Sequence, residues 1–125
     1  LQNSKVGVVT VAGGQGTRLG FNAPKGTLPI TPIKNKSLFQ YFAESIARAS
    51  EKDGSDIKWF IMTSKLNEND TKNYFEKNNY FGLKENQIFF FSQGTMPSIS
   101  KNGKILMSNK SSIAFEVFLP SVLPT

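Results

Sequence analysis

The sequence VGVVTVAGGQGTRLG occupies residues 6–20 and indicates how the chain begins its fold. Residues 6–12 are apolar and rich in β-branched side chains, which is typical of a buried strand. The glycine-rich loop at residues 13–20 would let the backbone approach a ligand closely and would line an anion site with N–H groups. Arg18 adds a planar guanidinium, and Lys25, within Pro24-Lys25-Gly26, adds a point charge. The stretch therefore predicts a site for a polyphosphate.

The spacing of the glycines excludes two common phosphate-binding motifs. A P-loop needs Gly, four residues and then Gly-Lys-Ser/Thr, and no such string occurs in the chain. A dinucleotide fingerprint reads Gly-x-Gly-x-x-Gly, whereas Gly14 and Gly16 are followed by three residues before Gly20. A structural turn is the simpler interpretation of the glycines alone, so the polyphosphate hypothesis depends on Arg18 and Lys25.

The composition limits the chemistry that the chain can perform. Its 125 residues include no Cys and no His, which excludes thiol nucleophiles, disulfides, Ser-His triads and His or Cys metal sites. A metal would need oxygen ligands, which suits Mg²⁺ carried with substrate phosphates. No apolar run approaches the roughly 20 residues that a membrane helix needs, and no secretory signal is visible. We therefore expect a cytoplasmic enzyme with no membrane partner.

The net charge of the chain is +6. A basic surface attracts nucleic acid, but it attracts anionic nucleotides equally well. The lysines are scattered along the sequence, so solvated surface charge is the simpler interpretation of most of them. No recognised nucleic-acid-binding motif occurs, and we expect no nucleic-acid partner.

Strand-like and helix-like segments alternate along the chain. Strands are expected at residues 6–12, 57–63 and 87–92, and helices at residues 38–52 and 67–78. Ser37 and either Asn67 or Asn69 are the expected N-caps of the helices. Asn102-Gly103 predicts a hairpin turn within residues 98–107. The alternation predicts an α/β fold with a Rossmann-like parallel sheet.

Ligands of such sheets bind outside the carboxyl ends of the strands. Each expected strand is followed by a candidate binding segment: the glycine-rich loop, Thr63-Ser64 and Gln93-Gly94. Because these segments would meet at one edge of the sheet, their convergence supports a nucleotide site more strongly than any single motif.

The sequence resembles the UDP-sugar pyrophosphorylase family. The resemblance rests on residues 12–20 and 24–26 and on the later strings at residues 61–64, 80–83 and 89–97, which occur in the family's order. Within the family, the string Gly14-Gln15-Gly16-Thr17-Arg18 is most similar to the UDP-N-acetylglucosamine pyrophosphorylases. The glucose branch usually has a loop nearer Gly-Gly-Leu-Gly-Thr, but UDP-glucose and broad-range UDP-sugar enzymes share the same frame and stay an alternative.

The resemblance implies transfer of a uridylyl group from UTP to N-acetylglucosamine 1-phosphate, with release of pyrophosphate, on a nucleotidyltransferase (GT-A-like) domain. It implies that Arg18 and Lys25 are catalytic, because they would neutralise the phosphates during attack. The implied nucleotide-binding residues are Ala12, Gly13, Gly14, Gln15, Gly16, Thr17, Thr63, Gln93 and Gly94. Mg²⁺ is the implied cofactor, with ligands outside this chain. From the residues alone, surface charge at Arg18 and Lys25 and a turn residue at Gln93 stay the alternative interpretations.

The resemblance ends near Ala114. Residues 1–114 are expected to form the nucleotide-binding part of the domain, and residues 115–125 a tail unlike the family. Because family members run to several hundred residues, we expect an incomplete domain that is inactive alone. A fragment, a frameshifted or truncated reading frame and a trimmed form are the competing explanations. A non-catalytic module that binds uridine nucleotides is the alternative function.

Overall fold

The computed structural model describes residues 6–109, 112–113 and 115–117. The chain divides into two compact units, Leu1–Ser92 and Gln93–Thr125. All of the predicted parallel strands and both predicted helices fall in the first unit. The glycine-rich loop lies there too, so this unit holds most of the predicted site.

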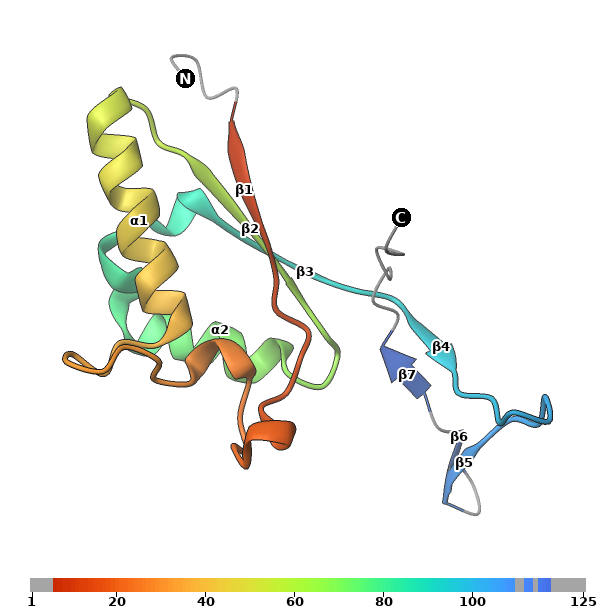
Figure 1. Ribbon diagram of the computed structural model, residues 1–125. Coiled ribbons are helices and arrows are strands. Elements are labelled where there is room, and N and C mark those ends of the chain that lie inside the picture. Colours follow the sequence, from red (N-terminus) through yellow and green to blue (C-terminus); the bar gives the residue numbers. More distant parts are fainter. Residues whose placement is uncertain (1–5, 110–111, 114, 118–125) are drawn as a thin grey trace, which may run out of the picture. The chain divides into compact units, whose positions relative to one another are not determined.

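A parallel sheet forms one layer of the first unit (Figure 1). Its strands are β1 (Gly7–Val11), β2 (Lys58–Thr63) and β3 (Ile88–Ser92), in the order β1-β2-β3. Helix α1 (Leu38–Asp53) connects β1 to β2, and helix α2 (Glu68–Lys77) connects β2 to β3. Short 3-10 turns occupy Thr17–Leu19, Lys25–Thr27, Asn79–Gly82 and Glu85–Gln87. The predicted α/β fold with a parallel sheet is confirmed.

Helix α1 has a capping residue at each end. The Ser37 hydroxyl accepts a hydrogen bond from the Gln40 backbone N–H at 3.2 Å, which satisfies one of the free donors of the first turn. At the other end, Gly54 adopts a left-handed φ of 65° and donates its N–H to the Ser50 carbonyl. The predicted N-cap at Ser37 is confirmed.

Helix α2 packs against the rest of the unit through one narrow face. Thr71 and Phe75, one turn apart, are its fully buried residues. Glu68 lies in its first turn and Lys77 in its last, so both charges oppose the helix dipole favourably. The helix is therefore stabilised by the packing of its buried face and by the charges at its two ends.

The core lies between the two helices and one face of the sheet. Trp59 and Ile61 of β2 are fully buried, and so are Phe39 of α1 and Phe75 of α2. The Phe75 ring lies 5.0 Å from that of Phe39 and 5.4 Å from that of Trp59, both in edge-to-face arrangements. Full burial of one such large side chain contributes roughly 1.5–3 kcal/mol. The Trp59 Nε1–H, which would otherwise be unsatisfied, donates to Thr10 Oγ1 at 2.8 Å.

The opposite face of the sheet carries apolar side chains that stay exposed. Val9, Phe60 and Phe89 share one row of the register, and the Phe60 and Phe89 rings stack at 5.1 Å. Val9 is 65% exposed and Phe89 is 39% exposed. Parallel sheets are ordinarily covered on both faces, whereas the described residues cover only the face that carries Trp59.

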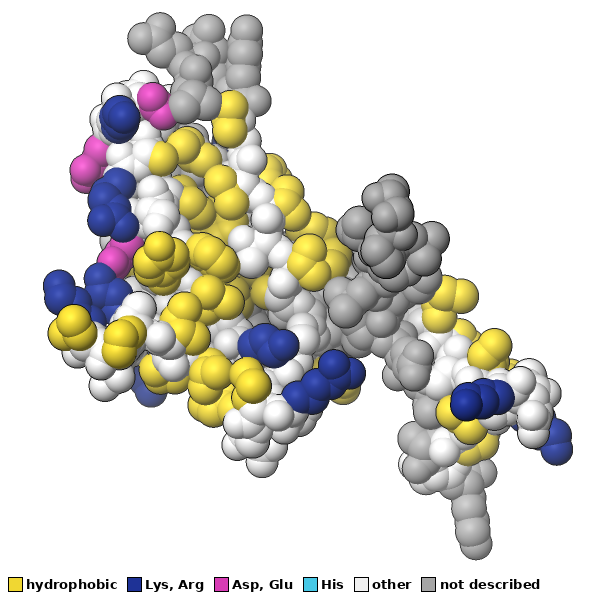
Figure 2. Space-filling view, in the orientation of Figure 1, with side chains coloured by type: hydrophobic (Ala, Val, Ile, Leu, Met, Phe, Trp, Pro, Cys, Tyr) yellow, Lys and Arg dark blue, Asp and Glu magenta, His cyan; other side chains and the backbone are white. Residues whose placement is uncertain are grey.

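An apolar groove of about 500 Å³ runs between β1 and α1. Residues 8–11 line one side of it, and the other side includes Phe42 and Ala49 of the helix. Figure 2 shows hydrophobic side chains gathered along this part of the surface. The groove follows β1 because that strand pairs only with β2 among the described strands.

Among the described residues of the second unit, strands form two short antiparallel pairs. Strand β4 (Thr95–Pro97) pairs with β7 (Phe115–Val117), and β5 (Met107–Asn109) pairs with β6 (Ser112–Ile113). Between them the chain turns at Gly103, whose φ is 75°, and Ser100 N–H donates to the Lys104 carbonyl at 2.7 Å. The predicted turn at residues 102–103 is confirmed. The predicted boundary after residue 114 stays a prediction, since that residue lies outside the described ones.

Candidate functional site

The glycine-rich loop closes on itself at the carboxyl end of β1. Gly16 N–H donates to the Ala23 carbonyl at 3.0 Å, and Lys25 N–H donates to the Gly14 carbonyl at 3.1 Å. These bonds flank an antiparallel bridge between Gln15 and Pro24. The closure brings the backbone of Lys25 beside that of Gly14, so the two predicted parts of the phosphate site form one loop.

Several backbone N–H groups of this loop have no hydrogen-bond partner among the residues that the structure describes. They belong to Gly13, Gly14, Gln15, Thr17 and Arg18. The last two stand at the start of the 3-10 turn Thr17–Leu19, where N–H groups have no partner inside the turn. Consecutive unpaired N–H groups form the concavity that binds anions in other proteins.

Two glycines of the loop are required by its shape. A Cβ on Gly16 would lie 2.9 Å from Phe21, closer than side-chain contacts allow. Gly20 has a φ of 69°, a left-handed conformation that residues with a Cβ rarely adopt. The glycines at these positions therefore serve the fold of the loop, while Gly14, which meets nothing within 4 Å, leaves its surface open.

The two predicted cations of the site are unpaired. Arg18 and Lys25 are both exposed, and neither side chain makes a hydrogen bond or ion pair with any described residue. Other lysines of the same unit are paired, in Lys36–Glu44, Lys72–Glu68 and Lys84–Asp56. The cations of the loop are thus available to an incoming anion.

Asn67, which the sequence suggested only as a helix cap, links two loops of the site. It is fully buried, and its Nδ2 donates to the Ala12 carbonyl at 3.0 Å and to the Gly14 carbonyl at 3.4 Å. Its Oδ1 accepts the Ser64 N–H at 2.9 Å. Asn67 does stand at the N-cap position of α2, but its side chain makes no capping bond there, and Asn69 lies inside the helix. The N-cap predicted at Asn67 or Asn69 is therefore confirmed in position at Asn67, although its amide bonds to carbonyls and an N–H outside the helix.

Ala12 and Thr63 lie at the carboxyl ends of β1 and β2. Ala12 N–H donates to the Met62 carbonyl at 2.7 Å, which extends the pairing of these strands by one step. Thr63 is fully buried, and its hydroxyl donates to the Phe91 carbonyl of β3 at 3.2 Å. The hydroxyl is therefore already used within the sheet, and a nucleotide contact from Thr63 stays a prediction.

Gln93 and Gly94 begin the second unit. Gln93 is only 6% exposed, yet neither its side-chain nitrogen nor its side-chain oxygen has a partner among the described residues. A buried amide without partners costs free energy, and such groups in native proteins call for an explanation. A ligand that offers both a donor and an acceptor would satisfy it, but contact between Gln93 or Gly94 and a nucleotide stays a prediction.

The described residues offer no obvious metal centre. They contain no group of three or more acidic side chains that could hold an ion. No helix within the same residues has the length and apolar character of a membrane span.

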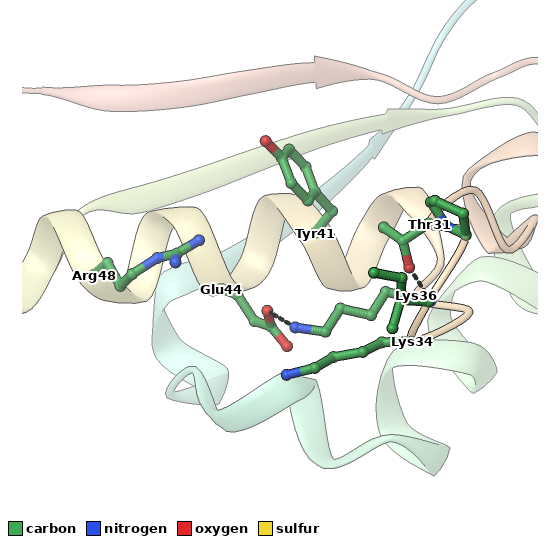
Figure 3. Close-up of a pocket in the computed structure, with 8 residues that line it drawn as sticks. Thr31, Lys34, Lys36, Tyr41, Glu44 and Arg48 are labelled. Atoms are coloured by element: carbon green, nitrogen blue, oxygen red, sulfur yellow. Dashed lines mark hydrogen bonds and ion pairs between the residues drawn. The ribbon is translucent and has the colours of Figure 1, made fainter.

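A second pocket, of about 370 Å³, lies apart from the loop residues (Figure 3). It is formed by the turn at residues 31–36 and the outer side of α1, where Lys36 pairs with Glu44 and Arg48 lies nearby. The hydrogen bond from Lys36 lowers the pKa of Glu44 from its ordinary value, against the opposing effect of burial. None of the predicted site residues lines this pocket, so it is separate from the predicted nucleotide site.

Comparison with known proteins relates the chain to nucleotide-sugar enzymes. The family described as UTP–glucose-1-phosphate uridylyltransferase matches residues 2–121, including residues 115–121 of the predicted tail. UDP-N-acetylglucosamine diphosphorylase 2 of Arabidopsis thaliana is 42% identical over 125 residues, which cover 91% of this chain and 25% of that protein. UDP-N-acetylglucosamine pyrophosphorylase of Saccharomyces cerevisiae is 48% identical over 103 residues, or 80% of this chain and 22% of that protein.

The fold is also that of a solved relative. The uridine diphosphate N-acetylglucosamine pyrophosphorylase of Trypanosoma brucei superimposes with a TM-score of 0.82 at 36% identity, over 93% of this chain and 24% of its own. The chain therefore spans about a quarter of the length of the relatives that it matches. By sequence and by fold, this chain belongs to the UTP–glucose-1-phosphate uridylyltransferase family.

Proposed function

We propose that the chain is the nucleotide-binding part of a uridylyltransferase that converts UTP and N-acetylglucosamine 1-phosphate into UDP-N-acetylglucosamine and pyrophosphate. The observation that carries the proposal is the loop at residues 13–20, whose unpaired N–H groups face no protein partner among the described residues. The unpaired side chains of Arg18 and Lys25 belong to the same closed segment. The names of the Arabidopsis and yeast relatives support the choice of sugar.

The proposed reaction suits the side chains that the chain possesses. An oxygen of the sugar phosphate attacks the α-phosphorus of UTP, and the bond from that phosphorus to the pyrophosphate oxygen breaks. Negative charge grows on the leaving pyrophosphate, where the loop N–H groups, Arg18 and Lys25 would stabilise it. Because no covalent protein intermediate is involved, the absence of Cys and His from the sequence is no obstacle.

Gln93 is the proposed contact for the uracil. Uracil offers an imide N–H and two carbonyls, and a glutamine amide offers one acceptor and two donors. The buried amide of Gln93 has no partner among the described residues, so hydrogen bonds to a base would remove an existing penalty. This supports recognition of the base by Gln93, with Gly94 leaving room beside it.

Magnesium and a cytoplasmic location belong to the proposal only through the family resemblance and the composition. The described residues contain no group of three or more acidic side chains, and no step is assigned to the ion. Because the chain spans only about a quarter of the length of its relatives, we propose that the 125 residues alone bind UTP without turning it over.

Isothermal titration calorimetry with UTP, CTP and pyrophosphate tests the binding part of the proposal. Arg18→Ala and Lys25→Ala should each weaken UTP binding roughly 10- to 100-fold, the effect of losing one charge-assisted hydrogen bond. Lys34→Ala is the matched control, because Lys34 is exposed and lies outside the loop. Equal UTP affinity in all four proteins would contradict the proposed site.

Release of pyrophosphate tests the catalytic part. The chain is incubated with UTP, Mg²⁺ and either N-acetylglucosamine 1-phosphate or glucose 1-phosphate, and we expect no turnover with either sugar. Turnover near the enzyme-typical value of about 10 s⁻¹ would show that the chain is a complete catalyst. A preference for glucose 1-phosphate would favour the UDP-glucose branch.

A further inference from the structure

We propose that Asn67 is a positioning residue, which holds the peptide groups of the loop at residues 13–20 in the orientation that binds phosphate. The inference rests on the proposed function and deepens it. Asn67 does not belong to the loop, but its fully buried amide joins the segment after β1 to the segment after β2. The hydrogen bond from Asn67 to Ala12 joins residues that are 55 positions apart in the sequence.

The orientation of the Asn67 amide follows from its partners. The Ser64 N–H, at 2.9 Å, is a donor and therefore needs the amide oxygen. The carbonyls of Ala12 and Gly14, at 3.0 and 3.4 Å, are acceptors and need the amide nitrogen. The reversed amide would set an oxygen against two carbonyl oxygens and a nitrogen against an N–H. The amide oxygen of Asn67 thus accepts the Ser64 N–H, and its nitrogen donates to the two carbonyls.

Holding these carbonyls also fixes the N–H groups that follow them. In a planar trans peptide, the C=O of one residue and the N–H of the next point in opposite directions, and the described residues contain no cis peptide. With the Ala12 carbonyl turned toward Asn67, the Gly13 N–H points away from it. The Gly14 carbonyl accepts from both Asn67 and the Lys25 N–H, and the Gln15 N–H that follows it points away from them. Both N–H groups are unpaired among the described residues, which leaves them free to donate to a ligand.

The backbone of Asn67 is itself held firmly. Its carbonyl accepts the Thr71 N–H at 2.9 Å, and its N–H donates to the Ser64 carbonyl at 3.2 Å. The loop therefore takes its orientation from α2, which packs on the core through Phe75. Flexible glycines would otherwise have to be ordered when the ligand binds. The hydrogen bonds of Asn67 order them beforehand and so lower the entropic cost of binding.

The test compares Asn67→Ala and Asn67→Ser with the wild-type chain. Serine is a favoured N-cap residue and keeps a short acceptor near Ser64, but its hydroxyl cannot reach both carbonyls. Asn69→Ala is the matched control, since Asn69 is an exposed asparagine of the same helix. UTP and pyrophosphate affinities are measured by calorimetry at a temperature where circular dichroism shows every variant folded. The amide signals of Gly13 and Gln15 are followed by ¹H–¹⁵N NMR without ligand.

We expect both Asn67 variants to bind UTP and pyrophosphate at least about tenfold more weakly, a change of about 1.4 kcal/mol. Their Gly13 and Gln15 amide signals should shift or broaden, whereas Asn69→Ala should leave affinity and signals unchanged. Folded Asn67 variants with wild-type affinity, or with unchanged Gly13 and Gln15 signals, would overturn the inference. Failure of the wild-type chain to bind UTP would instead overturn the proposed function. The ligand-free NMR comparison would still test whether Asn67 holds the Gly13 and Gln15 amides in position.

Discussion

Gly26 and Phe39 approach each other so closely that a side chain at position 26 would overlap the aromatic ring. A Cβ built on Gly26 lies 2.2 Å from Phe39 Cζ. Phe39 is fully buried and packs against Phe75 and Trp59, so its ring has no space to move into. The segment that carries Lys25 is thereby seated directly on the core of the first unit.

Gly26→Ala should lower the free energy of unfolding by about 1–3 kcal/mol, the usual cost of overpacking a core. Urea denaturation followed by circular dichroism measures the change. Gly14→Ala is the control, because a Cβ there meets nothing within 4 Å and the backbone is not left-handed. Gly14→Ala should leave stability equal or slightly raised, since alanine restricts the unfolded chain, and equal losses in the two variants would show that the contact with Phe39 is not the cause.

Gln93→Leu should separate stability from recognition. Leucine removes a buried amide that has no partner among the described residues, so the free energy of unfolding should stay equal or rise. Binding of UTP should weaken, by roughly 0.5–1.5 kcal/mol for one lost hydrogen bond, while binding of pyrophosphate should not change. Thermal denaturation and calorimetry give the two quantities. An equal loss for both ligands would argue against base recognition by Gln93.

Glu44→Gln should make the stability of the chain less dependent on pH. The Lys36 hydrogen bond lowers the pKa of Glu44 in the folded state, so the carboxylate stabilises the fold above its ordinary pKa. That contribution is lost as the pH falls from the ordinary pKa of a glutamate through the lowered pKa of Glu44. Melting temperatures from pH 3 to 7, in roughly unit steps across the carboxyl range, should therefore differ near neutrality and converge in acid. Parallel curves would mean that the ion pair contributes nothing.

Val9→Lys should reduce self-association of the chain. Val9 lies on the uncovered face of the sheet, in one row with Phe60 and Phe89, and exposed apolar surfaces of this kind promote association. Sedimentation velocity over a range of concentrations measures the effect. Ile33→Lys makes a similar change at a residue that is 91% exposed in the turn beside α1, away from the sheet. If both variants reduce association equally, net charge and not the sheet face is responsible.

Much of the fold could be predicted because its signals are local. The β-branched run before the glycines specifies β1, and the Ser37 hydroxyl and Gly54 mark the ends of α1 through contacts within a few residues. Gly103 likewise allows the predicted turn through its own φ. The alternation of such segments was sufficient to predict the parallel sheet.

The candidate site was predictable in its residue types but not in its internal contacts. The order of residues is enough to predict that a glycine-rich segment follows β1 and that Arg18 and Lys25 accompany it. The hydrogen bond from the N-cap residue Asn67 to the Ala12 carbonyl and the close approach of Gly26 to Phe39 form only when the chain folds. A buried amide bonds to whichever unsatisfied groups the packing brings to it. That choice depends on residues distant in the sequence, and no local pattern records it.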